Sequence, residues 1–472
     1  MIKLRLADVS EAVGGVLSVD ADPDVVVTGK CVLDSRAVDP GDLFIAVKGE
    51  NHDGHDHVEA ALAAGAVAAI VSTQGPGERI VVPDTVTALA ALAHDVRGRC
   101  PHLTVVALTG SSGKTSTKDI LGQVLNTVGV TVWPEGSFNN ELGLPMTVLR
   151  IDEHTRYLVL EMGSRGIGHV RQLCEIVRPD VALVLNVGSA HVGEFGSKDS
   201  TAQAKGEIVE ALASEGVAVL NGDDPYVSAM AQRTHAPIRW FGSGANADVQ
   251  VVDIELDELA RPTTTLRIDS NTHRVELSLH GEHQALNVAA AAAAATAAGL
   301  TAEQVFAALP QVVPQSRWRM EVAEAADSTI VVNDAYNANP ESMTAALRAL
   351  VAMGRGKQTW AVLGEMRELG DASILAHDEV GRLAVRLGVD RLIGVGEACR
   401  PMVLGAASEG YYGGEAHFSP DAHDARVYLK EHSTPGDVIL LKASRAAGLE
   451  ELADQVLADH GGAISPQRGD VQ

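Results

Sequence analysis

Short runs of Val, Leu, Ile and Ala, each followed by a helix-like segment, recur along most of this chain. Such runs are typical of parallel strands that are buried on both faces, and the helical segments between them are the crossovers that parallel pairing requires. The sequence therefore predicts two α/β units, each built on a parallel sheet. The expected strands are 104–108, 157–160, 181–185 and 217–220 in the first unit, and 329–332, 359–363, 391–395 and 438–441 in the second.

The rest of the chain differs from these two units. Residues 1–100 combine strand-like text with a helical segment at 57–64, which predicts a small mixed α/β domain, and residues 248–279 alternate polar and apolar side chains, as antiparallel strands do. A chain of 472 residues exceeds the size at which one core stops growing. We therefore predict an α/β protein of three domains: 1–100, a central 101–315 with a parallel sheet and a small antiparallel one, and a Rossmann-like 316–472.

The charge balance limits the partners. The formal net charge is −25 and no stretch is densely basic, which argues against a nucleic-acid partner. An acidic surface also repels anionic small molecules. Any phosphate site must therefore be built locally from backbone N–H groups, a few Lys or Arg side chains and metal ions.

The four cysteines and the N-terminus indicate the compartment. Cys31, Cys100, Cys174 and Cys399 form no CxxC pair, so neither a zinc site nor a disulfide framework is expected. The first residues, MIKLRLADVSEAVGG, carry charges where a signal peptide needs an apolar core, and the Ala-rich stretches are too short to span a bilayer. We expect a cytoplasmic protein with no membrane span.

The strongest local motif is TVVALTGSSGKTSTKDILGQVL at 104–125, where a strand, a Gly/Ser loop and a helix follow one another. Backbone N–H groups and a helix N-terminus then point at one spot, where they would hold a phosphate chain. The GxxxxGK[ST] spacing is not met, because Leu108 stands where its first Gly belongs. The alternative is a Gly-rich turn with a solvent-facing lysine. The predicted phosphate-binding residues are Thr109, Gly110, Ser111, Ser112, Gly113, Lys114, Thr115 and Ser116.

This loop resembles that of the Mur ligases and their folylpolyglutamate synthetase relatives. Seven further segments stand in the same order as in that family, so the resemblance spans essentially the whole chain. Segments 34–66, DAYNANPES at 334–342 and LGEMRELG at 363–370 resemble the D-alanyl-D-alanine-adding branch most. The seven segments are GSFNNELGLPMTVL, LEMGSRGIGHV, NVGSAHVGEFGS, AKGEI, GEHQALNVAAA, SRWRMEV and NDAYNANPESM.

The resemblance implies an amide-forming ligase that uses ATP and Mg²⁺. In that family's reaction the terminal carboxylate of UDP-N-acetylmuramoyl-tripeptide becomes an acyl phosphate, and the amine of D-alanyl-D-alanine then displaces the phosphate. Because two anions must meet, charge neutralisation is the main task of such a site. We expect the enzyme to act as a monomer.

Several residues acquire expected roles in this way. Lys114 reaches the β and γ phosphates, and Thr115 and Glu161 supply hard oxygens for Mg²⁺. His191 resembles the family's second-metal ligand, although a hydrogen-bonded core histidine is an equal reading of that residue. Lys205 aligns with a lysine that some relatives convert to a carbamate. We therefore expect Lys114, Glu161, His191 and Lys205 to be catalytic.

The remaining expected contacts concern the nucleotide and the substrates. Asn287 offers a donor and an acceptor to the adenine edge, against the alternative of a capping or surface asparagine. Arg319 and Asp334, by resemblance, reach the phosphates and ribose, so closure of the third domain would complete the site. The expected substrate-binding residues are Ser35, Arg36, Lys48, Asn139, Asn140, Asn337, Asn339, Ser444 and Arg445.

Three other readings remain open at this stage. A different Mur-type or folate ligase would keep the ATP site and change the outer pockets, and a kinase or GTPase would use the same loop without an amine acceptor. A nicotinamide-dependent oxidoreductase is suggested by the second Rossmann-like unit. That unit, however, has NDAYNANP where a GxGxxG loop would follow its first strand.

Overall fold

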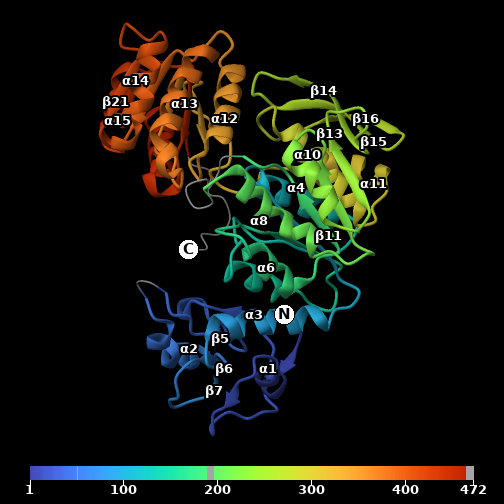
Figure 1. Ribbon diagram of the computed structural model, residues 1–472. Helices are drawn as coiled ribbons and strands as arrows, with labels where there is room; N and C mark the ends of the chain where they lie inside the picture. Colours follow the sequence, from blue (N-terminus) through green and yellow to red (C-terminus); the bar gives the residue numbers. More distant parts are fainter. Residues whose placement is uncertain (50–51, 189–195, 464–472) are drawn as a thin grey trace.

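The computed structural model describes residues 1–49, 52–188 and 196–463. They form three α/β units, each with its own main sheet (Figure 1). We call them the N-terminal unit, residues 4–98 from β1 to α3, the central unit, residues 104–308 from β8 to α11, and the C-terminal unit, residues 317–459, which runs from the segment before β17 to the end of α16. The predicted α/β class with three units is confirmed, whereas the proposed boundaries at 100 and 315 stay predictions.

The N-terminal unit is a small mixed sheet with helices around it. Strands β4 to β7 are parallel, β2 adds an antiparallel edge, and β1 pairs with β3 separately. The expected helix at 57–64 is present as α2. The elements are β1 (Leu4–Arg5), α1 (Leu6–Ala12), β2 (Val16–Leu17), β3 (Val26–Val27), β4 (Cys31–Val32), β5 (Leu43–Ile45), α2 (Val58–Ala64), β6 (Ala68–Val71), β7 (Arg79–Val81) and α3 (Thr85–Gly98).

Helix α3 joins this unit firmly to the next one. It runs between the two units in Figure 1. There it packs against two helices of the central unit, α5 (Gly143–Val148) and α6 (His169–Val177). The ring Nδ1 of His94 lies 3.0 Å from the carbonyl oxygen of Ile176, and Nε of Arg97 donates to that of Val177 at 3.2 Å. Because both acceptors lie in the last turn of α6, α3 also satisfies carbonyls that a helix end leaves unpaired.

The central unit is built on a nine-stranded sheet in the order β16-β15-β14-β13-β12-β11-β8-β10-β9. Pairing is parallel from β9 to β14 and antiparallel from β14 to β16. The predicted antiparallel strands therefore extend the parallel sheet. The strands are β8 (Thr104–Thr109), β9 (Thr131–Val132), β10 (Tyr157–Glu161), β11 (Val181–Val184), β12 (Val217–Asn221), β13 (Ile238–Gly242), β14 (Val249–Leu256), β15 (Pro262–Ile268) and β16 (Asn271–Glu276).

Helices cover both faces of this sheet. Successive side chains of each strand therefore point alternately into two apolar cores, one on each face. Val105 and Ala107 pack with α6 and α8, whereas Val106 and Leu108 pack with α4 and α10. The run of alanines in α10 is buried, which brings that helix close to the sheet. The helices are α4 (Lys114–Asn126), α5 (Gly143–Val148), α6 (His169–Val177), α8 (Lys198–Glu210), α9 (Pro225–Ala229), α10 (Gln284–Ala297) and α11 (Ala302–Ala308).

The C-terminal unit repeats this design with a six-stranded sheet in the order β17-β18-β22-β19-β20-β21. Only the edge strand β17 is antiparallel. The four strands predicted here are confirmed as β18, β19, β20 and β22. The elements are β17 (Glu321–Glu324), β18 (Ile330–Asn333), α12 (Pro340–Met353), β19 (Thr359–Leu363), α13 (Ser373–Leu387), β20 (Arg391–Val395), α14 (Arg400–Glu409), β21 (Ala416–Ser419), α15 (Ala422–His432), β22 (Val438–Lys442) and α16 (Leu449–Asp459).

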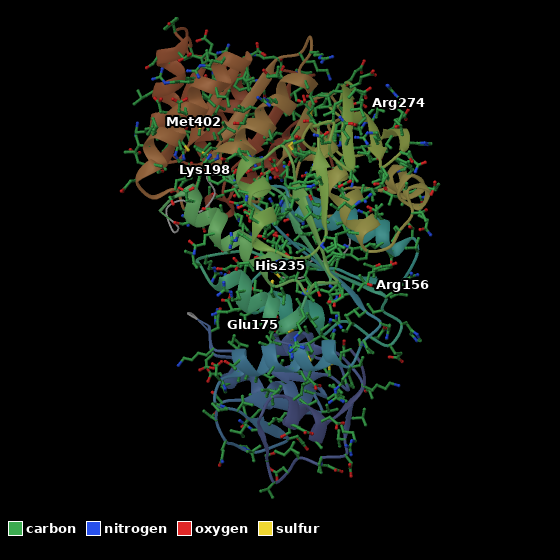
Figure 2. All side chains as sticks on the ribbon, turned by 45° about the vertical axis from the view of Figure 1, so that its right-hand side comes forward. Arg156, Glu175, Lys198, His235, Arg274 and Met402 are labelled. Atoms are coloured by element: carbon green, nitrogen blue, oxygen red, sulfur yellow. The ribbon has the colours of Figure 1, made fainter. Side chains whose placement is uncertain are left out.

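All four cysteines are buried, and none is in a disulfide. Within the described residues, every helix is too short or too polar to cross a bilayer. Figure 2 shows the side chains of the three units, with the N-terminal unit in blue at the bottom.

Helices α13 and α14 pack closely because glycine stands at their crossing. A Cβ built at Gly381 would collide with the carbonyl oxygen of Met402. We predict that Gly381→Ala lowers the free energy of unfolding of the C-terminal unit by about 1–3 kcal/mol, the usual cost of overpacking. Gly98→Ala is the matched control, since a Cβ there meets open space. It should be neutral or stabilising by up to about 1 kcal/mol. Urea unfolding of both variants measures the difference, and equal stabilities would contradict it.

Candidate functional site

A pocket of about 280 Å³ lies between the central and C-terminal units. The central unit contributes the loop after β8, the segment before α5 and the end of β10, and the C-terminal unit contributes Arg319 and the start of α12. Carboxyl ends of parallel strands are where α/β proteins bind ligands. Among the predicted site residues, those that line it are Ser111, Ser112, Gly113, Lys114, Thr115, Ser116, Asn139, Asn140, Glu161, Arg319, Asn337 and Asn339.

The loop between β8 and α4 has the shape that anion binding needs. Gly113 adopts φ +80°, and a Cβ there would lie 2.6 Å from Oδ1 of Asn287. Glycine is therefore required twice, for its left-handed backbone and for the close approach of Asn287. Since α4 begins at Lys114, its first-turn N–H groups have no partner inside the helix and the positive end of its dipole faces the pocket.

Asn186 holds this loop from the neighbouring strand. Its Oδ1 accepts hydrogen bonds from the backbone N–H groups of Ser111 and Ser112, both at 2.9 Å, and its Nδ2 donates to the Ser112 carbonyl at 3.2 Å. At the end of β8, the hydroxyl of Thr109 donates a 2.8 Å hydrogen bond to the Met162 carbonyl. The loop is thus shaped before any ligand arrives.

Two lysines converge on one carbonyl group at the start of the loop. Nζ of Lys114 donates to the Gly110 oxygen at 2.8 Å, and Nζ of Lys205, from α8, donates to the same oxygen at 3.1 Å. Burial lowers the pKa of both amines, and the charge of Lys114 lowers the pKa of Lys205 further. An anion in the pocket would relieve this accumulation of positive charge.

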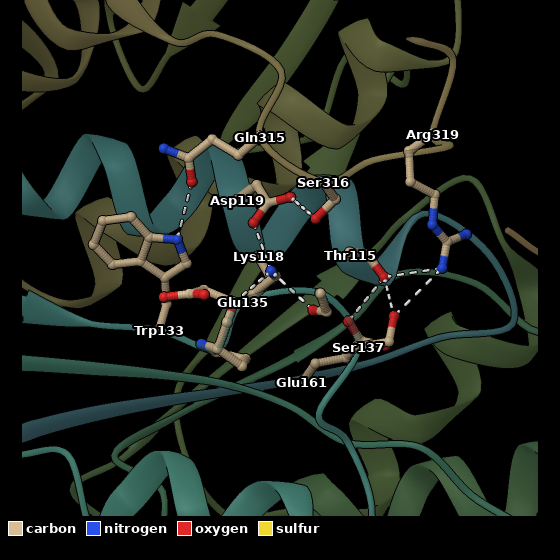
Figure 3. Close-up of polar contacts among 12 residues, drawn as sticks. Thr115, Lys118, Asp119, Trp133, Glu135, Ser137, Glu161, Gln315, Ser316 and Arg319 are labelled. Atoms are coloured by element: carbon tan, nitrogen blue, oxygen red, sulfur yellow. Dashed lines mark hydrogen bonds and ion pairs between the residues drawn. The ribbon is translucent and has the colours of Figure 1, made fainter. Parts of the chain in front are cut away.

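A hydroxyl, a carboxylate and a guanidinium, from Ser137, Glu161 and Arg319, surround the Thr115 hydroxyl (Figure 3). That hydroxyl donates to Oε2 of Glu161 at 3.0 Å and lies 2.9 Å from Oγ of Ser137. Nδ2 of Asn139 donates to the other Glu161 oxygen at 2.7 Å. Glu161 is only 1% exposed, and a buried carboxylate is stabilised by a cation. Hydroxyl and carboxylate oxygens are ligands that suit Mg²⁺.

The predicted metal ligands are thus partly brought together. Thr115 and Glu161 are in contact, whereas His191 lies outside the described residues. Within the described residues there is no group of three or more His, Cys, Asp and Glu side chains arranged to hold a metal. The Mg²⁺ role of Thr115 and Glu161 stays a prediction that the donor chemistry fits.

The C-terminal unit reaches the same place. Nη2 of Arg319 donates to the Thr115 hydroxyl at 3.2 Å and to Ser137 Oγ at 3.4 Å, and Nδ2 of Asn339 donates to the Ser111 carbonyl at 3.4 Å. The guanidinium of Arg319 stacks on the ring of Tyr336, 4.2 Å from its centroid. Both units therefore contribute to one site.

The remaining five predicted residues on this side of the molecule stabilise the pocket walls or lie outside them. Oδ1 of Asn140 accepts from the Gly143 N–H at 2.8 Å and fixes the start of α5, while Oδ1 of Asn337 accepts from Ala338 N–H at 2.8 Å. Asp334 is buried behind the pocket, where it accepts from Nζ of Lys442 at 2.7 Å and from the backbone N–H of Met320 at 3.1 Å. Ser444 and Arg445 do not line the pocket: Oγ of Ser444 accepts from the backbone N–H of Arg367 at 3.0 Å, and the guanidinium of Arg445 lies 5.0 Å from the Trp318 ring centroid.

The three predicted residues of the N-terminal unit do not line this pocket. Ser35 and Arg36 form a short 3-10 turn, in which Arg36 pairs with Asp34 at 2.7 Å and lowers the pKa of that carboxyl to about 2. Lys48 is exposed beside the undescribed residues 50–51. Their expected role in binding the UDP-sugar stays a prediction.

Sequence reasoning missed three structural residues of the site. Asn186 had a usable signal, because it is the first polar residue after a buried strand, where site residues of α/β proteins gather. Glu207 had none. It receives the N–H groups of Gly168 at 2.5 Å and Arg171 at 3.0 Å, and so caps α6 from another helix. Ser137 lies in a loop whose path the sequence pattern does not specify.

The family models and relatives can be set against this geometry. Three family models match the chain: the Mur ligase family, catalytic domain at residues 31–97, the Mur ligase middle domain at 108–295, and the Mur ligase, glutamate ligase domain at 318–445. The chain is 43% identical to UDP-N-acetylmuramoyl-tripeptide--D-alanyl-D-alanine ligase from Mycobacterium bovis, over 97% of this chain and 98% of that one. The enzyme of the same name from Bacillus subtilis is 34% identical, with 97% and 99% covered.

Solved structures agree over nearly the full length. A crystal structure of MurF from Acinetobacter baumannii matches with a TM-score of 0.88 at 31% identity, covering 97% of this chain and 99% of that chain. A MurF ligase from Thermotoga maritima in complex with ADP matches with a TM-score of 0.80 at 31% identity, covering 92% and 98%. Identity at this level across all three units, together with the loop and the two-unit pocket, establishes that the chain belongs to the Mur ligase family.

Proposed function

We propose that this enzyme joins D-alanyl-D-alanine to the peptide carboxylate of UDP-N-acetylmuramoyl-tripeptide, with ATP converted to ADP and phosphate. The observation that carries the proposal is the pocket in which the β8–α4 loop, Glu161 and the C-terminal Arg319 converge. Full-length relatives of that name support the choice of substrates. The structure with ADP supports the choice of nucleotide.

The geometry suits a two-step reaction. The substrate carboxylate attacks the γ-phosphorus of ATP, so that an acyl phosphate forms and ADP leaves. The dipeptide amine then attacks the carbonyl carbon, loses its proton, and expels phosphate. Lys114 and Arg319 bring cations to the place where two anions meet, and bringing those anions together is the main barrier to the first step. Mg²⁺, held by Thr115 and Glu161, would neutralise phosphate charge there.

The other contacts follow from position. We assign the adenine edge to Asn287, which lies directly against the loop, and the ribose to Asp334 on the facing unit. Asn139, Asn140, Asn337 and Asn339 line the pocket where the peptide and dipeptide would meet. Ser444 and Arg445 complete the dipeptide side, and Ser35, Arg36 and Lys48 receive the UDP-sugar.

All of these groups come from one chain, so a monomer suffices for the reaction. The four unpaired thiols suit a reducing compartment such as the cytoplasm.

We also propose that Lys205 is converted to a carbamate. Its side chain is buried, and burial together with the charge of Lys114 lowers the pKa of its amine, which favours the neutral form that adds to CO₂. The neutral amine adds to CO₂ and loses a proton, which replaces a buried cation by an anion beside Lys114. That change would remove the repulsion between two amines that share one carbonyl and would supply a further oxygen ligand close to the phosphates.

The function is tested by ADP release from purified protein with Mg²⁺, ATP and UDP-N-acetylmuramoyl-tripeptide. We expect release to depend on D-alanyl-D-alanine, and mass spectrometry should detect the pentapeptide product. L-Glu, D-Glu and a free diamino acid serve as comparison acceptors. Faster release with any of these would assign the chain to another branch, and ATP turnover indifferent to every acceptor would indicate a kinase or ATPase.

In the same assay, Lys114→Ala should reduce ADP formation at least about a hundredfold, because it removes a preorganised charge from the reacting phosphates. Binding of the UDP-muramoyl-tripeptide, measured by calorimetry, should stay nearly unchanged. Lys357→Ala, at an exposed position in the C-terminal unit, is the matched control and should behave as the wild type. Turnover retained by Lys114→Ala would defeat the phosphate-loop assignment.

The carbamate predicts a dependence on bicarbonate and pH. Activity should rise with added bicarbonate and fall as pH drops, because protonation of the Lys205 amine prevents its addition to CO₂. Carbon NMR in ¹³C-bicarbonate should detect a carbamate signal in the wild type and in Lys357→Ala and none in Lys205→Ala. An unmodified amine by intact mass and electron density, with activity insensitive to bicarbonate, would refute the modification.

A further inference from the structure

Two adjacent charged residues of α4 are buried one turn beyond the phosphate loop. Lys118 is 0% and Asp119 9% exposed at their side chains, and Nζ of Lys118 lies 2.5 Å from Oδ1 of Asp119. Neighbouring residues on a helix point in different directions. Apart from their mutual contact, the two side chains therefore reach separate parts of the chain, as Figure 3 shows.

Lys118 fixes the segment that carries Ser137. Its ammonium donates to the carbonyl oxygens of Pro134 at 2.7 Å and Gly136 at 3.1 Å. The next residue, Ser137, is the one whose hydroxyl meets Thr115 and Arg319. Lys118 therefore holds the backbone directly before Ser137, whose hydroxyl contacts Thr115.

Asp119 fixes the segment that leads to Arg319. Its second oxygen, Oδ2, accepts a 2.5 Å hydrogen bond from the Ser316 hydroxyl, 197 residues later in the chain. Arg319 is the third residue after Ser316, so its backbone lies within about 10 Å of this anchor. Trp318 and Met320, on either side of Arg319, have φ of 58° and 50°. A displacement of Ser316 would therefore redirect the arginine.

The connecting segment 313–316 is attached to the central unit at two further points. Gln123 exchanges hydrogen bonds with the backbone of Val313, at 3.1 and 3.0 Å, and Nε1 of Trp133 donates to Gln315 at 3.2 Å. Both of these attachments are exposed to water, which competes for them. The bond to Asp119 has a buried, charged acceptor and is the stronger kind. Ser316 is therefore the last of these attachment points before Arg319.

Stability alone does not account for the buried pair. Burial raises the pKa of Asp119, which reflects the free energy needed to keep its charge out of water, although Lys118 opposes that shift. Apolar side chains of similar volume would fill this space without that penalty. They could not, however, accept the Ser316 hydroxyl or hold two carbonyl groups of the Ser137 segment.

We infer that Asp119 is a positioning residue for the ligase reaction, which acts through Ser316 to set the point from which Arg319 reaches the nucleotide phosphates. The inference rests on the proposed function, because it takes the anion beside Thr115 to be the nucleotide. Asp119 contacts neither substrate nor phosphate itself. Its effect belongs to the step in which Arg319 stabilises the transferring phosphoryl group, rather than to nucleotide binding.

Ser316→Ala tests this without leaving an unpaired charge. We expect kcat for ADP release to fall at least about tenfold, since small displacements of a catalytic group are costly, while KM for ATP changes less than about threefold. Ser316→Thr keeps the hydroxyl and should restore kcat. Ser433→Ala, which removes a hydroxyl bonded to the Leu429 carbonyl far from the site, is the matched control and should have no effect.

Asp119→Ala completes a double-mutant cycle. It should reproduce the loss in kcat, and the double variant should be no slower than the slower single variant, because both changes break one bond. If Asp119→Ala does not fold, the two Ser316 variants decide the question. A kcat of Ser316→Ala within about twofold of the wild type, or an equal loss in Ser316→Thr, overturns the inference. A wild-type enzyme that lacks dipeptide-dependent ADP release overturns the proposed function instead.

Discussion

The hydroxyl of Thr115 is the point on which the site depends, because three distant parts of the chain meet there. It is bonded to Glu161 at the end of β10, to Ser137 in the loop before α5, and to Arg319 from the C-terminal unit. None of these partners is a neighbour in sequence. The hydroxyl sits in the first turn of α4, so the same short helix start provides backbone N–H groups for an anion and a side-chain oxygen for a cation.

The site solves an electrostatic problem set by the composition. A chain with a formal net charge of −25 repels ATP and a UDP-linked peptide at long range. Lys114 and Arg319 oppose that charge locally, and burial strengthens their effect because little water screens them. The same burial lowers the pKa of the Lys114 and Lys205 amines, because it disfavours their charged forms.

The two junctions between units differ in kind. The N-terminal unit is joined to the central unit through a continuous apolar core and through α3, which also satisfies the end of α6. The C-terminal unit meets the pocket through individual polar contacts, such as those of Arg319 and Asn339, and its apolar core takes in only Leu259 and Ala260 from the described residues of the central unit. Polar contacts can be exchanged for ligand contacts at little net cost, whereas separating an apolar core is expensive. Relative motion during turnover is therefore expected at the C-terminal junction.

The sequence by itself determined the strand and helix pattern, the three-unit organisation, the phosphate loop and the family. Periodic burial and glycine spacing are local properties, so residues such as Gly113, Lys114 and Glu161 could be assigned from the order of residues alone. Tertiary structure alone decided which side chains meet: that Asn186 shapes the loop, that Lys114 and Lys205 share one carbonyl, and that Asp119 bonds Ser316. Those contacts join residues up to 197 positions apart. A local sequence pattern does not predict contacts between residues so far apart in the chain, because the packing of sheets and helices determines them.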